Sequence, residues 1–304
     1  MGAASIIINR RRVNAVEQFG RPCRRAAAAS GWAPSFLETS RDDAGDGLAR
    51  DAVAAGAGLV VAAGGDGTVR ACAQAVAGTG IPLGIIPLGT GNLTARALGI
   101  PLRTSDALAV AFGGRDRRID LATADGMPFL SMAGMGLDAA VVSATPPVLK
   151  ERLGWLGYAA AGLTRLPGRR HEFTVRLDDG PPLARLARSV VVGNAGLLPG
   201  GFTLLPDARM DDGLLDVGIL APAGLLGWVV VAGRVLARSR RDDRRLERFR
   251  ARRVEIQAAV PLPRQSDGEI IGPARSLTVR LAGRLTVRVP EVVAIRDGRN
   301  TLRC

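Results

Sequence analysis

The sequence predicts an α/β domain with a parallel sheet, followed by a second domain that is mainly antiparallel β. Up to about residue 118, apolar strand-like segments alternate with helical ones; beyond it, strand-like segments follow one another with few helices between them. A glycine-rich turn, 64–68, also lies between an apolar strand-like segment and a helical one. In parallel sheets, ligands bind at turns of this kind, at the carboxyl ends of the strands.

The first domain begins with a strand at 6–9, after which helices and strands alternate. The other expected strands are 35–38, 59–63 and 81–87, and the expected helices are a stretch ending near residue 30, then 47–55, 69–76, 92–98 and 104–112. Right-handed crossovers place the carboxyl ends of parallel strands on one edge of the sheet. The turns 64–68 and 88–92 both follow strands, so we expect them side by side at that edge.

The second domain is predicted from a run of strands and two turn signals. The expected strands are 119–122, 129–132, 173–177, 189–192, 215–220, 253–257, 276–281 and 285–289. The run Asp178-Asp179-Gly180 indicates a hairpin. Helices are expected at 148–166 and 225–236, the arginine-rich segment 238–253 is interpreted as a solvated helix, and the lone histidine, His171, is expected in a loop. The predicted domains are 1–120 and 121–288, with 289–304 returning to the first.

Composition favours an anionic partner. The net charge is +13, and all basic residues except Lys150 are arginines. Such a surface attracts acidic lipid headgroups or polyphosphate, although a simple solvated surface stays open as an explanation. Aromatic residues make up only 4% and are not interleaved with the arginines, so a nucleic-acid partner is not expected.

The cysteines and the apolar segments, taken with the basic charge, suggest a cytoplasmic protein that associates peripherally with a membrane. The three cysteines, Cys23, Cys72 and Cys304, have neither disulfide-framework nor metal-ligand spacing. The apolar stretch 217–237 is interrupted by Pro222, so it is not expected to span a bilayer. Exposed edges of the β domain leave a homodimer open.

The glycine-rich turn carries the chemistry. In Gly64-Gly65-Asp66-Gly67-Thr68, unpaired backbone N–H groups at a helix N-terminus favour phosphate, and a carboxylate beside them suits magnesium or its water shell. The turn 87–92 adds the polar side chains of Thr90 and Asn92. Phosphofructokinases and NAD kinases use similar turns, and a purely structural turn is the alternative.

Further motifs follow in order: Gly134-Met135-Gly136-Leu137-Asp138-Ala139, Gly193-Asn194-Ala195, the segment 206–216, and Asp267-Gly268-Glu269. Together with the two turns, they make nearly the whole chain resemble the diacylglycerol kinase catalytic family of bacterial lipid kinases, which is related to the sphingosine kinases. The downstream asparagine-glycine signature of NAD kinase is not visible.

The resemblance implies a Rossmann-like α/β domain followed by an antiparallel β-sandwich. It also implies transfer of the γ-phosphate of ATP, with Mg²⁺, to a lipid hydroxyl, most directly diacylglycerol to give phosphatidic acid. A kinase for a sphingoid-type, nucleotide or polyol acceptor and a non-catalytic relative that binds nucleotide or lipid stay open.

The resemblance also implies site residues. Glu269 would accept the hydroxyl proton, and Asp66 is the second catalytic candidate. The nucleotide-binding residues would be Asn9, Thr39, Gly64, Gly65, Asp66, Gly67, Thr68, Thr90 and Asn92. Asp212 and the carbonyl oxygens of Arg209 and Leu214 would hold magnesium, with Asp66 and Asp120 in the surrounding water network. Two positions depart from the family: Arg10, Arg11 and Arg12 follow Asn9 in place of a Pro-x-Ser-Gly loop, and Leu93 replaces a frequent aspartate.

Overall fold

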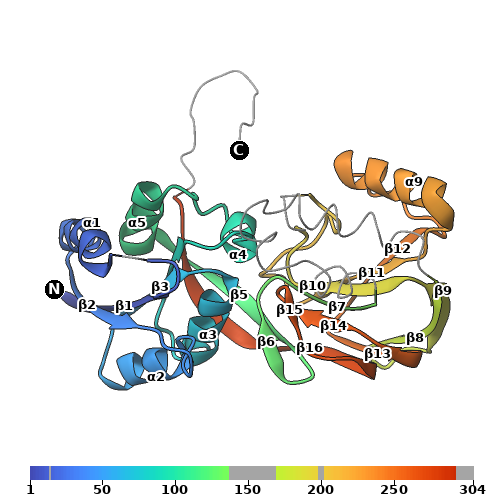
Figure 1. The fold of residues 1–304 in the computed structure, drawn as a ribbon, viewed down its shortest axis with the longest axis horizontal. Helices are drawn as coiled ribbons and strands as arrows, with labels where there is room; N and C mark the ends of the chain where they lie inside the picture. The colour runs from blue at the N-terminus through green and yellow to red at the C-terminus, as the bar shows by residue number, and fades with distance from the viewer. Residues whose placement is uncertain (14, 137–168, 198–201, 292–304) are drawn as a thin grey trace.

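The computed structural model describes residues 1–13, 15–136, 169–197 and 202–291, and it contains two sheets (Figure 1). The first part contains β1 (Gly2–Ile8), α1 (Val16–Ala29), β2 (Trp32–Glu38), α2 (Asp46–Ala54), β3 (Leu59–Gly64), α3 (Asp66–Val76), β4 (Leu83–Pro87), α4 (Leu93–Ala97) and α5 (Thr104–Gly113). The second contains β5 (Arg115–Ala124), β6 (Met127–Phe129), β7 (Met132–Gly136), β8 (His171–Leu177), β9 (Leu183–Ala187), β10 (Ser189–Gly193), β11 (Leu215–Leu220), α9 (Gly224–Leu236), β12 (Leu246–Ala251), β13 (Arg253–Leu262), β14 (Arg264–Ser266), β15 (Glu269–Ile270) and β16 (Ala274–Val289). The predicted fold class, parallel α/β followed by antiparallel β, is confirmed.

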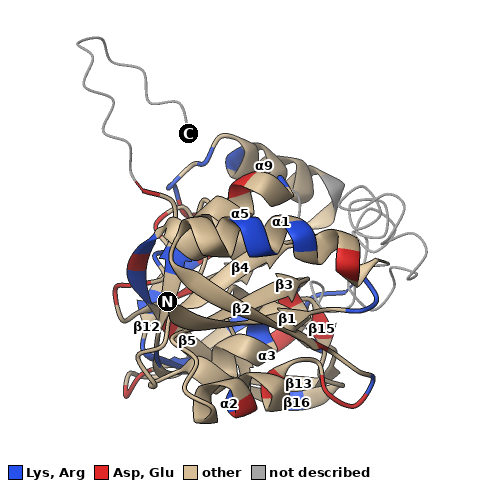
Figure 2. Ribbon diagram, turned by 90° about the vertical axis from the view of Figure 1, so that its left-hand side faces the viewer, with Lys and Arg blue, Asp and Glu red and all other residues tan. Residues whose placement is uncertain are grey.

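The parallel part of the larger sheet has the strand order β2-β1-β3-β4. Helices α1 and α5 cover one face and α2 and α3 the other (Figure 1), which is why every residue of β3 and β4 is buried. Helix α1 turns Cys23 and Ala27 inward, whereas Arg21 and Arg25 are exposed. Figure 2 shows basic residues on this helix in blue. This three-layer arrangement holds the carboxyl ends of β1, β3 and β4 along one edge.

Strand β16 belongs to both parts of the molecule. It pairs with β13 and β5 in antiparallel fashion, and near its end Val287 pairs with Leu83 of the parallel strand β4. The two strands predicted at 276–281 and 285–289 are therefore one strand, with an irregularity before Gly283, whose φ of 129° suits glycine. The domain boundaries at 120 and 288 remain predictions, and residues 292–304 lie outside the described chain.

The second part is a sandwich with an apolar interior. The smaller sheet has the order β12-β11-β10-β7-β14-β15 and packs against the antiparallel strands of the larger one. Alternation decides which side chain enters the interior: Val190 and Val192 of β10 point into the sandwich, whereas Val191 faces the layer beneath α9. Helix α9 thus covers the outer face of the smaller sheet (Figure 1).

Three sequence-based expectations need correction or fall outside the description. The solvated helix predicted at 238–253 is wrong, because its second half forms β12, in which Leu246 and Ala251 are buried at the ends of the strand. Strand β12 pairs with β11, and the turn before it is fixed by Asp243, whose carboxylate accepts the amide of Arg245 at 2.8 Å. His171 begins β8 and is not in a loop. The helix predicted at 148–166 lies outside the described residues.

Candidate active site

The two glycine-containing turns pack backbone against backbone. Strand β3 ends at Gly64, Gly65 precedes α3, and the amide of Leu88 donates to the carbonyl of Gly64 at 2.8 Å. A Cβ atom on Gly89 would lie 2.7 Å from Cα of Gly65, and one on Gly64 would lie 2.7 Å from Cβ of Thr68. Only glycine permits these approaches, so the turns 64–68 and 88–92 lie side by side as predicted from the sheet edge.

Asn92 fixes the second turn. Its backbone is left-handed, with φ of 48°, a conformation that asparagine tolerates better than most residues. Its side-chain oxygen accepts the amide of Gly89 at 2.9 Å, and its side-chain nitrogen donates to the carbonyl of Gly89 at 2.7 Å. Both polar atoms are thereby used within the turn, which holds the partly exposed Thr90 between β4 and α4.

Asn9 connects the end of β1 to the glycine-rich turn. Its side-chain nitrogen donates to the hydroxyl of Thr68 at 2.8 Å, and its side-chain oxygen accepts the amide of Arg11 at 3.0 Å. Thr39 follows the neighbouring strand β2, and its amide donates to the carbonyl of Ile8 at 2.9 Å. Asn9 and Thr39 therefore follow the ends of neighbouring strands, and Asn9 reaches Thr68 in the first turn of α3, although the chain lacks the glycine loop of the family.

Asp66 is partly buried at the start of α3, where its carboxylate points toward α4. The amide of Thr94 donates to its Oδ1 at 3.3 Å. Burial, and secondarily the negative charge of Asp267, raises the pKa of Asp66 to about 6, and backbone amides of α4 oppose this shift. Burial disfavours the ionised form of such a carboxylate, so a nearby cation would stabilise that form strongly.

Asp267 organises the hairpin between β14 and β15. Its carboxylate accepts the amides of Leu130, Ser131 and Met132 at 2.8–2.9 Å. These bonds bend the chain between β6 and β7, which explains why the single strand predicted at 129–132 is divided. Burial raises the pKa of Asp267, and the three amides oppose the shift. Each bond to a charged acceptor contributes about 1.5–3 kcal/mol, so the hairpin is held firmly.

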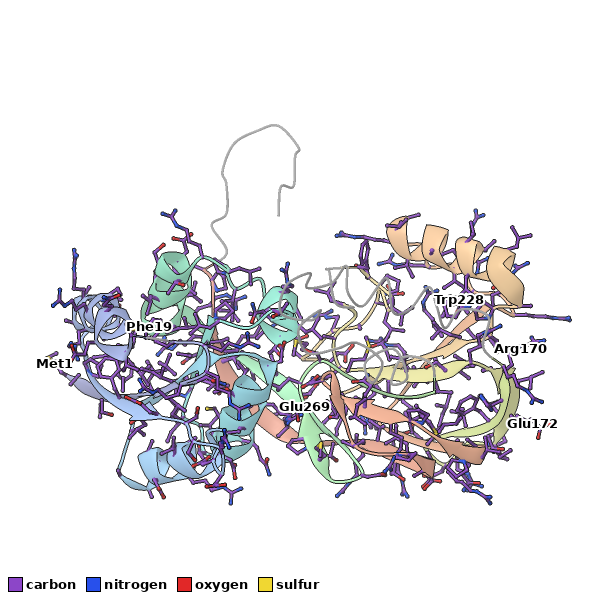
Figure 3. All side chains as sticks on the ribbon, viewed as in Figure 1. Met1, Phe19, Arg170, Glu172, Trp228 and Glu269 are labelled. Carbon is purple, nitrogen blue, oxygen red and sulfur yellow. The ribbon has the colours of Figure 1, made fainter. Side chains whose placement is uncertain are left out.

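Glu269, at the start of β15, is brought onto the glycine-rich turn by this hairpin. Its Oε1 lies 2.9 Å from the position that a Cβ on Gly67 would occupy, so the carboxylate rests directly on the turn. Its Oε2 accepts from Nη2 of Arg70, one helical turn after Asp66, at 2.5 Å. The Glu269 side chain is 52% exposed and that of Arg70 only 14%. Figure 3 shows Glu269 between α3 and the β domain.

The residues predicted to hold magnesium form a second group. Asp120 is buried; its Oδ2 accepts the amide of Gly213 and its Oδ1 accepts from Nε of Arg284, both at 2.7 Å. Asp212 accepts the amide of Leu214 at 3.1 Å and pairs with Arg250. The described contacts thus join Asp120 to the segment 209–214, and not to Asp66.

Two carboxylates of this second group share one arginine. Arg250 also pairs with Asp216 at 3.3 Å, so one guanidinium lies between two acids. Oδ2 of Asp216 is buried without a hydrogen-bond partner, and burial raises the pKa of Asp216 to about 6, with the charge of Asp212 adding to the shift. Asp212 and Asp216 therefore carry more negative charge than Arg250 neutralises. No cluster of three or more metal-ligating side chains occurs among the residues that the structure describes.

A buried polar chain links the two groups. Asn194, which is fully buried, donates to the carbonyls of Asp120 at 2.8 Å and Leu130 at 3.0 Å. The hydroxyls of Ser131 and Thr94 are 3.2 Å apart, next to the amide that Asp66 accepts. Sequence reasoning assigned no role to Asn194, Arg70 or Asp267. The spacing of Arg70 from Asp66, four residues on a helix, suggests a pair between these two residues, whereas the structure pairs Arg70 with Glu269.

Comparisons with known proteins agree with this geometry. Residues 4–124 match the family described as Diacylglycerol kinase catalytic domain, and residues 131–293 match the YegS C-terminal NAD kinase beta sandwich-like domain. A Pseudomonas aeruginosa protein named "Probable lipid kinase YegS-like" is 38% identical over 253 residues, 80% of each chain. The chain belongs to the YegS-like family of probable lipid kinases, and its first part matches the diacylglycerol kinase catalytic domain. A Pseudomonas fluorescens protein of the same name is 35% identical over 88% of this chain and 89% of its own.

Solved structures show that the fold is that of the diacylglycerol kinase family. A diacylglycerol kinase from Bacillus anthracis superposes with a TM-score of 0.73 at 22% identity, covering 96% of this chain and 98% of that one. An NAD kinase from Archaeoglobus fulgidus in complex with ATP gives a TM-score of 0.50 at 11% identity, covering 95% and 94%. The α/β-plus-sandwich architecture is therefore shared with the diacylglycerol kinase and, more distantly, with the NAD kinase.

Arg70 is expected to act as a positioning residue for Glu269. In Arg70→Met, the carboxylate loses the partner that holds it over Gly67, so we expect kcat to fall about tenfold. The KM for ATP and the melting temperature should stay within error, since an ion pair to a half-exposed acid contributes about 1 kcal/mol at most. Steady-state kinetics, with Arg70→Lys as partial rescue and Arg50→Met on α2 as control, checks this. A rise in KM with unchanged kcat would instead make Arg70 a nucleotide ligand.

Proposed function

We propose that this protein is an ATP-dependent lipid kinase that transfers the γ-phosphate to the free hydroxyl of diacylglycerol, giving phosphatidic acid. The observation that carries the proposal is the position of Glu269, whose carboxylate rests on Gly67 within the glycine-rich turn. Phosphate held by that turn and a hydroxyl that gives its proton to Glu269 would be neighbours. Phosphoryl transfer requires mainly such positioning and a modest base.

The nucleotide site follows from the turn geometry. The N-terminal amides of α3 have no partners within the helix and point toward the edge where the strands end, which favours the phosphates of ATP. Asn9 orients Thr68, and Asn92 holds the neighbouring turn with Thr90. In this proposal, Thr39 and Thr90 add hydroxyl contacts to the nucleotide.

Magnesium fits the acidic residues described above. Asp212, with the carbonyl oxygens of Arg209 and Leu214, would hold a structural ion, and Asp120 would orient the same segment through its bond to Gly213. Asp66, whose raised pKa reflects an unneutralised carboxylate, would face the ion that accompanies ATP. When bound, magnesium supplies charge neutralisation for the phosphate oxygens.

The proposed enzyme works in the cytoplasm at a membrane surface that contains its substrate. Support comes from the net charge of +13, which favours anionic lipid headgroups. Among the described helices, none combines the length and apolar character that crossing a bilayer requires.

Incubation with γ-labelled ATP and a panel of acceptors tests the function. The panel contains diacylglycerol, monoacylglycerol, a sphingoid base, and soluble nucleosides and polyols. We expect labelled phosphatidic acid from diacylglycerol, and loss of label when EDTA removes magnesium. A labelled soluble acceptor would show that the substrate is not a lipid but would support the kinase activity. Absence of any labelled product, with ATP binding intact, would overturn the proposed function.

A further inference from the structure

Helix α9 presents an apolar face to solvent. Its exposed large side chains are Leu226, Val229 and Leu236, with 77%, 60% and 68% of their surface accessible. Together with the exposed Gly233, they follow each other by three or four residues and so share one face of the helix. Large apolar side chains gathered in this way are uncommon on a monomer unless the surface binds something.

The opposite face of α9 accounts for the stability of the helix. Trp228, Val231 and Val235 pack on the layer that covers β10 and β11, and Trp228 lies beneath the helix in Figure 3. The only charged residue of α9, Arg234, turns back to Asp243, with Nη2 of Arg234 3.0 Å from the carboxylate. The outer face is thus apolar along its length. Its side chains do not pack on the core, so folding does not explain why they are apolar.

Arginines gather where α9 ends. Arg238, Arg241 and Arg244 are exposed, and no carboxylate among the described residues pairs with them. Arg238 and Arg241 join Arg240 and Ser239 in lining a wide, open pocket of about 660 Å³. Arg240 itself pairs with Asp207 at 2.8 Å. Its lining therefore includes guanidinium groups, which bind phosphate oxygens well.

We propose that α9 and the arginines after it form a membrane-docking surface, whose occupant is a bilayer containing anionic phospholipid. The apolar face of α9 enters the interfacial region of the bilayer, and Arg238, Arg241 and Arg244 bind lipid phosphates beside it. Charge complementarity selects this occupant: an apolar strip with unpaired cations matches acyl chains next to anionic headgroups. The proposal rests on the proposed function in so far as a lipid acceptor must be reached at a membrane.

Vesicle co-sedimentation at 0.1 M salt tests the surface, using phosphatidylcholine vesicles with and without phosphatidylglycerol. The variants are Leu226→Ser/Val229→Ser/Leu236→Ser for the apolar face, Arg238→Gln/Arg241→Gln/Arg244→Gln for the charge, and Arg21→Gln/Arg25→Gln/Arg275→Gln as a control with the same loss of charge. At this salt concentration, charges farther than about 10 Å from the membrane are screened, so the control should bind almost as the wild type does.

We expect the wild type to bind vesicles with phosphatidylglycerol. The variant lacking Arg238, Arg241 and Arg244 should bind them about a hundredfold less tightly, and the apolar-face variant at least tenfold less tightly. Equal weakening in the control, or binding unaffected by both α9 variants, would overturn the proposal. It would also be overturned if the wild type does not bind vesicles, or if it is a dimer that the apolar-face variant separates into monomers.

Activity on a monomeric short-chain diacylglycerol separates this proposal from the kinase assignment. The α9 variants should phosphorylate that soluble acceptor at the wild-type rate, since none of the altered residues contacts the glycine-rich turn. Transfer to the short-chain lipid without vesicle binding would contradict the docking surface and support the kinase activity. Vesicle binding that depends on α9, without transfer to any acceptor, would support the docking surface and contradict the kinase activity.

Discussion

Replacing Asp66 with asparagine is expected to reduce phosphoryl transfer at least a hundredfold while making the unliganded protein more stable at pH 8. Asparagine keeps the shape of the side chain and an oxygen for the amide of Thr94. It removes the charge that would face the ion accompanying ATP. Loss of activity and gain of stability would therefore have one cause, which is that the carboxylate is ionised at the proposed cation site.

The sign of the stability change follows from the pKa. In the folded protein the pKa of Asp66 is about 6, above its ordinary value of 3.8. As the pH rises from about 4 to about 6, the folded state holds its proton more tightly than the unfolded state, so folding stability is lost over this range. The amide of the Asp66→Asn variant does not titrate, and the stability advantage of the variant should be about 1–3 kcal/mol at pH 8 and vanish near pH 4.

Urea unfolding of the apo protein at both pH values, together with the labelled-ATP assay, measures both effects. Asp51→Asn on the exposed side of α2 is the control, and it should change stability by less than about 0.5 kcal/mol. Retention of more than half of the activity in Asp66→Asn would exclude a role for this carboxylate in transfer. A loss of stability at pH 8 would show that its charge is already compensated in the apo protein.

Glu269→Gln is expected to lower kcat about 10²–10⁴-fold, the usual contribution of a general base. Glutamine cannot take up the hydroxyl proton, but its oxygen can still accept from Arg70. Because the side chain is half exposed, folding should be unaffected. The dissociation constant for ATP should also change little, since only the base is altered.

Single-turnover transfer and equilibrium ATP binding distinguish these outcomes. Glu172→Gln, an exposed residue on β8, serves as the control. If Glu269→Gln transfers phosphate at the wild-type rate, another group removes the proton. If it loses ATP binding as well, the carboxylate has a structural part that its contact with Gly67 alone does not predict.

The sequence predicted those parts of the site that depend on local pattern. A glycine-rich turn between an apolar segment and a helix defines its own conformation, so the side-by-side position of the turns 64–68 and 88–92 followed from the order of strands in a parallel sheet. Asn9, by contrast, was named only through the resemblance, and its contact with Thr68 comes from the structure. Segment 238–253 was misread because its many arginines suggested a solvated helix, whereas pairing with β11, a long-range effect, makes part of it a strand.

The remaining features depend on contacts between distant segments. Asp267 binds amides at 130–132, and Arg70 pairs with a residue 199 positions away. No periodicity encodes such partners, because the fold of two sheets brings them together. The resemblance to the family identified Glu269, and only the structure shows what holds it in place.

The sharing of β16 between the parallel sheet and the sandwich limits how the enzyme can close around its substrates. Hinge bending between the two parts would have to disturb the pairing of β16, which pairs with β5 from Val279 to Val289, with β13 in the sandwich and with β4 at Val287. The two parts are thus joined by the main-chain hydrogen bonds of one strand. Closure on a nucleotide is therefore expected from smaller elements, such as the short β14–β15 hairpin that carries Glu269, the proposed base.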